Sequence, residues 1–221
     1  MSNSKPRADA KARFEKDIAS HEMTVRLAQG MHRHLTFRRP SGSVYHFHIT
    51  TWPGYLCISG DMGCYVFSRL PDMFEFFRES SINPQYWAQK LQADEKYTGH
   101  RAFSEDLYHA ALKSDFEGWT FDSEDDRKRA WEAIEDEFDG IMHAESTEHA
   151  VRQAMEWKCP VSKQRFSDFW EHTLEDYTFQ FLWCCYAIQW AIARFDETTA
   201  ASTEQPSAID AQRAEAPPVS A

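Results

Sequence analysis

The hydrophobic pattern of the chain changes at Pro71, and this change limits the possible folds more than any other feature. Before it, residues 22–69 contain short runs rich in β-branched and aromatic residues, and turn residues such as Gly30 and Pro53 separate these runs. Apolar and polar side chains alternate along 44–51, which is typical of a strand with one buried face. Because the connections are short, we expect an antiparallel meander of about five strands within 22–69.

After Pro71 the apolar residues recur at steps of three and four, which predicts helices within 71–195. The longest such pattern covers 166–195 and indicates one long, aromatic-rich helix. Its second half, 179–195, is apolar on nearly every side, so we expect the core to surround it. A membrane span is the alternative, but a span needs about 20 mostly apolar residues. This run is shorter and contains Gln and Arg, so we expect no membrane insertion.

These patterns predict an α+β fold, with the antiparallel meander packed against the helical half. Aromatic residues make up 14% of the chain, which is enough ring surface to require a packed core. We expect a single domain over 1–195. The segment 196–221 has no aromatic residue and is rich in Ala, Ser, Thr, Glu and Pro, which predicts a disordered tail. The five cysteines form no Cys-x-x-Cys pair, as is typical of reduced thiols in a cytoplasmic protein.

The formal charge of −11 is spread unevenly, since residues 100–149 hold five Lys and Arg against fifteen Asp and Glu. Such a segment repels phosphate backbones, so we expect it to make no direct contact with DNA. It attracts a basic surface on another protein. The alternative interpretation is that acidic helices keep an aromatic-rich protein soluble. The residues that we expect to contact a partner are Glu124, Asp125, Asp126, Glu132, Glu135, Asp136 and Asp139.

Two His-x-His pairs, His32 with His34 and His46 with His48, suggest a second kind of site. Residues two apart in a strand point to the same face, so each pair could offer two imidazoles to one metal ion. Asp61 at a nearby turn could add an oxygen ligand. A metal-assisted hydrolase or nucleotide-processing enzyme is therefore the alternative function. The spacing fits no closed metal signature, and the simpler interpretation is a polar sheet face without a cofactor.

The sequence contains no nucleophile or nucleotide-binding motif: GxSxG, GxxxxGK[ST] and GxGxxG are all missing. We therefore expect a protein that is not an enzyme. An RNA-binding sheet face would need exposed aromatic residues among basic ones, and Phe37, Tyr45 and Phe47 are the candidates. The competing expectation is that these rings face the core.

The run TWPGYLCISGDMGCYVFSRLPDMFEFF at 51–77, INPQYWAQKL at 82–91 and EDYTFQFLWCCYAIQWAI at 175–192 resemble a family of uncharacterised proteins from tailed bacteriophages and prophages. The resemblance covers roughly residues 14–195. It implies an accessory protein in the cytoplasm of a host bacterium, and the role we expect is inhibition of a CRISPR or restriction defence by binding a basic host protein. It transfers no catalytic residue. Self-association through the aromatic segment 166–195 is a further expectation.

Overall fold

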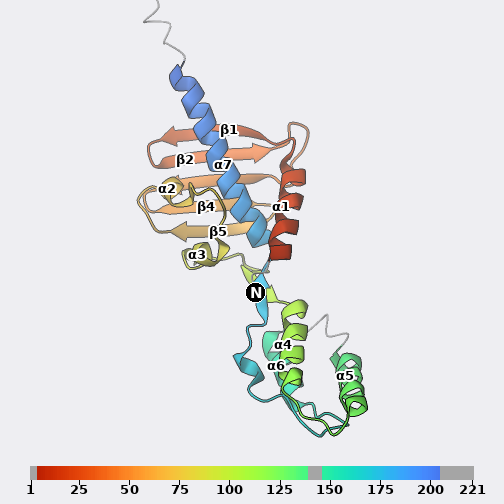
Figure 1. Ribbon diagram of the computed structural model, residues 1–221. Helices are drawn as coiled ribbons and strands as arrows, with labels where there is room; N and C mark the ends of the chain where they lie inside the picture. Colours follow the sequence, from red (N-terminus) through yellow and green to blue (C-terminus); the bar gives the residue numbers. More distant parts are fainter. Residues whose placement is uncertain (1–3, 139–145, 205–221) are drawn as a thin grey trace, which may run out of the picture. The chain divides into compact units, whose positions relative to one another are not determined.

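The computed structural model describes residues 4–138 and 146–204, which divide into two compact units. We call residues 1–97 with 179–221 the sheet unit and residues 98–178 the helical unit (Figure 1). The sequence predicts one domain over 1–195, whereas the structure distributes this stretch over two units, and we describe each unit by itself. The predicted α+β class is confirmed.

The sheet unit contains a six-stranded antiparallel sheet in which each strand pairs with the next along the chain. The five predicted strands are present, but the run 44–51 is a strand only from Phe47, since Tyr45 has a positive φ of 62°. A sixth strand of three residues, which the apolar pattern does not predict, joins the far edge. The strands are β1 (Glu22–Gln29), β2 (His32–Arg38), β3 (Phe47–Trp52), β4 (Tyr55–Gly60), β5 (Gly63–Ser68) and β6 (Leu91–Ala93).

The described helices of the sheet unit lie on one face of this sheet (Figure 1). Two of them begin directly after a residue whose side chain caps the helix. Asp72 accepts a hydrogen bond from a backbone N–H of the first turn of α2, and Asn83 does the same for α3, whose first residue is Pro84. The helices are α1 (Ser4–Ile18), α2 (Met73–Phe77), α3 (Pro84–Ala88) and α7 (Phe179–Glu204).

Aromatic rings fill the space between the sheet and its helices. Phe37 and Phe47 stack at 4.6 Å on neighbouring strands, and both rings are fully buried. Trp190 of α7 lies 5.4 Å from Phe37, while Trp183 meets Phe47 edge to face at 5.6 Å. The expectation that Phe37 and Phe47 face the core is therefore confirmed. Removing one such ring costs about 3–5 kcal/mol of stability.

The predicted long helix over 166–195 is wrong in its first half. Residues 169–171 form a 3-10 turn and 175–177 a short strand, and α7 begins only at Phe179. The apolar spacing misleads because it continues across two separate cores: Phe169 packs in the helical unit and Phe181 on the sheet. At the other end, α7 continues to Glu204, into the predicted tail, and residues 205–221 lie outside the described residues.

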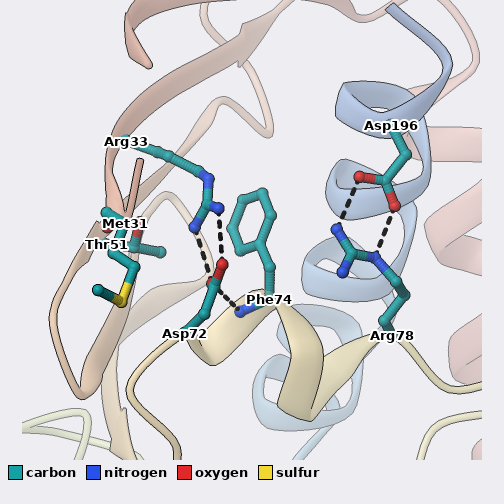
Figure 2. A network of polar contacts seen from close by, with 7 residues as sticks. All are labelled: Met31, Arg33, Thr51, Asp72, Phe74, Arg78 and Asp196. Carbon is teal, nitrogen blue, oxygen red and sulfur yellow. Dashed lines mark hydrogen bonds and ion pairs between the residues drawn. The ribbon is translucent and has the colours of Figure 1, made fainter. Parts of the chain in front are cut away.

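A polar network joins β2, α2 and α7 beside this core (Figure 2). Nη1 and Nη2 of Arg33 each donate a hydrogen bond to one carboxylate oxygen of Asp72 at 2.8 Å. The same guanidinium lies 4.3 Å from the centre of the Phe74 ring. Arg78, at the end of α2, forms a second two-point ion pair with Asp196 of α7. These contacts position a helix that is too short to be stable alone.

The helical unit has its own core, centred on Tyr108, Phe138, Phe166 and Phe169. Helix α4 begins at a Ser104 cap and α6 at a Ser146 cap, as serine hydroxyls favour. Its elements are β7 (Arg101–Phe103), α4 (Glu105–Glu117), α5 (Glu124–Phe138), α6 (Thr147–Glu156), the 3-10 turn η1 (Phe169–Glu171) and β8 (Glu175–Tyr177), with β7 paired to β8.

Candidate interaction surface

The two units differ sharply in formal charge. The helical unit contains nine Lys and Arg against twenty Asp and Glu, which gives −11. The sheet unit contains fifteen of each kind and is neutral. The smaller unit therefore accounts for the whole formal charge of the chain, and its surface is where an electrostatic partner would be attracted.

Helix α5 presents most of its carboxylates to solvent because its apolar residues occupy one stripe. Ala130, Ile134 and Phe138 recur at four-residue steps and are buried in the core of the helical unit. The acidic residues lie on the remaining faces. Of the predicted contact residues, Glu124, Asp125, Glu132, Glu135 and Asp136 are exposed, Asp126 is half-buried, and Asp139 lies outside the described residues.

Cations partly compensate the first two turns of α5. Arg129 pairs with both Asp125 and Asp126, and Lys128 lies 3.9 Å from Glu132. The Ser123 hydroxyl donates to Asp126 at 2.8 Å, and this bond, followed by that from Arg129, lowers the pKa of the Asp126 carboxyl. The negative charges in the first two turns of α5 are therefore partly compensated by neighbouring Lys and Arg.

The last turns of α5 carry a less compensated group of carboxylates. Glu135 accepts a hydrogen bond from the indole N–H of Trp131 at 2.7 Å, which leaves its negative charge in place. Among the residues that the structure describes, no Lys or Arg forms an ion pair with Glu135, Asp136 or Glu137. We call Glu132, Glu135, Asp136 and Glu137 the acidic patch; all four are exposed.

The helical unit also contains a groove of about 650 Å³ between α6 and the segment 165–172. Its apolar lining is formed by Val151, Met155 and Trp170. Trp170 is 58% exposed, which is unusual for so large an apolar side chain. The remaining lining residues are polar or charged: Thr147, Glu148, Arg152, Glu156, Arg165 and His172.

The position of Trp170 follows from the backbone at Asp168, which adopts a left-handed conformation with φ 54°. This residue starts the 3-10 turn, in which Phe169 is fully buried while its neighbour Trp170 faces solvent. The spacing of apolar residues over 166–195 predicts a continuous helix that contains Trp170, and it does not predict the groove. The adjacency of Phe169 and Trp170 is no signal of this exposure, because neighbouring residues of a helix can both be buried, as Cys184 and Cys185 of α7 are.

Hydrogen bonds fix the rim of the groove. His172 Nε2 lies 2.8 Å from the carboxylate Oδ1 of Asp115 on α4, and its ring lies against Phe169 at 5.1 Å. Arg165 donates to the backbone carbonyl of Glu156 at 3.2 Å. The groove is thus a supported concave surface, the form that apolar anchors of a partner occupy.

The structure brings three of the four predicted histidines together in the sheet unit. The His48 ring lies 5.7 Å from that of His34 and 5.6 Å from that of His46. His46 Nδ1 lies 2.9 Å from Asp61. His32 is exposed at the start of β2. Within the described ranges no group of three or more His, Cys, Asp or Glu side chains could hold a metal ion, so the metal-assisted function stays a prediction without a coordination set.

Comparison with protein-family models, with curated proteins and with solved structures found no match to the chain. The resemblance to a bacteriophage family stays a prediction. Within the described residues no helix is both long and apolar enough to cross a membrane.

Proposed function

We propose that this protein acts by binding another protein through its helical unit. The observation that carries the proposal is the charge distribution: the helical unit has a formal charge of −11, whereas the sheet unit is neutral. Charge of one sign gathered on one part of a chain steers and orients a partner of the opposite sign. The partner therefore has a basic surface.

The acidic patch and the groove would contribute differently to such a complex. Exposed carboxylates mainly raise the association rate and make binding sensitive to salt. An exposed tryptophan in an apolar groove supplies contact energy, because large aromatic side chains dominate protein interfaces. Trp170, which lines the groove together with Val151 and Met155, meets this description.

A basic surface of this kind is common on proteins that bind nucleic acid, because neutralising phosphates requires Lys and Arg. We propose that the partner is such a protein, in a CRISPR or restriction defence of a host bacterium, and that the helical unit occupies its nucleic-acid groove. Support for this partner comes from charge complementarity and from the resemblance given above. The protein itself should not bind DNA through the helical unit.

The experiment is affinity capture from bacterial lysate with the full chain, washed at low and at high salt and compared with a Trp170→Ala variant. The proposal expects a basic, nucleic-acid-binding protein whose recovery falls as salt rises and falls again in the variant. Addition of duplex DNA should reduce its recovery by competition. A partner whose recovery changes neither with salt concentration nor in the Trp170→Ala variant would contradict the proposal.

A further inference from the structure

The sheet of the sheet unit ends at one edge in the long strand β1. Its only described neighbour is β2, so its other side faces no described strand. Seven of its eight residues are exposed, including Val25 at 44% and Leu27 at 40%. A long edge strand with exposed apolar side chains is a ready template for pairing with another strand. Short strands, charged side chains and bulges usually prevent this. The strand β1 is eight residues long, and its bulge lies after Val25, outside the segment Glu22–Val25.

Helix α7 extends beyond this edge. Along the helix, Phe181 contacts Tyr65 of β5, Trp190 contacts Phe37 of β2, and Phe195 lies near Arg33 of β2. The helix then continues for nine residues, to Glu204, and Figure 1 shows it running past β1. At 1.5 Å per residue this is about 13 Å, whereas neighbouring strands lie about 4.8 Å apart. The overhang is therefore long enough to cover at least one further strand.

A groove marks the place where this overhang leaves the sheet. It has a volume of about 420 Å³ and lies between α7 and the pair β1–β2, with Arg33 of β2 in its lining. Its strand side is formed by Val25, Ala28 and Gly30, and its helix side by Phe195, Thr198 and Thr199. A strand added beside β1 would extend the sheet next to this groove and cover the exposed side of Val25.

We propose that β1 pairs antiparallel with β1 of a second copy of this chain, about a two-fold axis at Thr24. The sequence of the strand is self-complementary in this register. Glu22 of each copy stands opposite Arg26 of the other, Met23 stands opposite Val25, and Thr24 stands opposite itself. Directly opposed side chains of opposite charge stabilise an antiparallel pair, and like charges destabilise it.

The faces of the strand agree with this register. Val25 lies on the α7 side, where it lines the groove, and Met23, two residues away, shares that side. Arg26 directly follows Val25 and precedes Leu27, which stands opposite His34, so alternation places Arg26 on the other face. The register of β1 against β2 shifts between Val25 and Leu27, so Glu22–Val25 is the regularly paired segment and Arg26 lies at the bulge that follows it. Both ion pairs of the dimer therefore fall on one face and both apolar pairs under the helices.

Other occupants would leave this complementarity unused. An extended segment of a different protein could add to the same edge, but nothing in its sequence would need to match Glu22 and Arg26. The inference concerns the sheet unit and does not depend on the proposed function of the helical unit.

The test is the molar mass of the full chain in solution, measured by light scattering over a wide range of concentration. We expect the mass to rise from that of one chain, 25.8 kDa, towards twice this value. Glu22→Arg alone and Arg26→Glu alone should each weaken the dimer about tenfold or more, because each replaces two opposite pairs by two like pairs. A Gln29→Arg variant, which changes an exposed residue of β1 outside the paired segment, should dimerise as the unchanged chain does.

Mixing the two single variants separates pairing from misfolding. In the mixed dimer the introduced arginine at position 22 faces the introduced glutamate at position 26, while the remaining Arg26 faces the remaining Glu22. An equimolar mixture should therefore recover the dimer that neither variant forms well. A chain that stays monomeric at every concentration would overturn the inference, as would partnering by a different protein's strand in its place. A dimer that forms equally well with either substitution would also overturn the inference. So would an equimolar mixture of the two variants that stays monomeric.

Discussion

The guanidinium of Arg33 and the carboxylate of Asp72 form a two-point ion pair, with both N–O distances at 2.8 Å (Figure 2). The same carboxylate accepts a hydrogen bond from the backbone N–H of Phe74 at 3.0 Å and so caps α2. One side chain thus connects an inner strand of the sheet to a five-residue helix. The hydrogen bonds from Arg33, more than any other contact, lower the pKa of Asp72 below its ordinary value of 3.8.

Replacing Asp72 by Asn keeps the cap and removes the charge, so we expect a loss of about 1 kcal/mol of stability near neutral pH, since solvent partly screens the pair. Because the folded state lowers the pKa, the contribution is complete above pH 3.8 and disappears as the pH falls through the lower folded pKa. Urea unfolding of both proteins as a function of pH measures this. A difference that persists unchanged in strong acid would contradict the account.

The histidines of the sheet predict a second pH effect. Burial, followed by the charges of His46 and His34, lowers the pKa of His48 below 6.5. The unfolded chain therefore takes up a proton near pH 6.5 that folded His48 does not, and stability falls as the pH drops below that value. A His48→Gln variant should lose less stability than the unchanged chain between about pH 7.5 and pH 5.5. An equal or larger loss would show that His48 does not contribute.

Two neighbouring aromatic residues should respond oppositely to truncation. Phe169 is fully buried, so Phe169→Ala should cost about 3–5 kcal/mol, measured by chemical unfolding. Trp170 is 58% exposed, so Trp170→Ala should change stability by no more than about 0.5 kcal/mol and act on partner binding instead. Similar losses of stability in the two variants would mean that segment 166–178 folds differently, for example as a continuous helix.

The sheet could be predicted from sequence because local and long-range signals agree there. Phe47 and Ile49 alternate with polar neighbours, and their partners Phe37, Leu35 and Ile58 occupy alternating buried positions of β2 and β4. The short strands β6, β7 and β8 could not be predicted, because three residues carry no measurable period. Segment 166–178 misleads for another reason. Phe166 and Phe169 are buried in the core of the helical unit. By coincidence, their spacing continues the helical spacing of the apolar residues of α7.

The candidate surface could be predicted only in part. The acidic residues of α5 are visible as a charge excess, and the buried positions Ala130, Ile134 and Phe138 follow from helical spacing. Trp170 could not be assigned to the surface, because its exposure depends on the left-handed backbone of the preceding Asp168. Nor does the sequence indicate that one contiguous unit carries the whole net charge, since this depends on where the boundary at residue 98 falls.

The measurement that tests the central claim most directly is capture of the basic partner by two charge-reversed chains with the same total charge. One carries Glu132→Lys, Glu135→Lys and Asp136→Lys on the acidic patch. The other carries the same change at three exposed carboxylates of the sheet unit, Glu15, Glu75 and Glu79. We predict that the first chain loses the partner and the second retains it. Equal recovery by both chains, or loss with the sheet-unit variant alone, would contradict the claim that the helical unit is the binding surface.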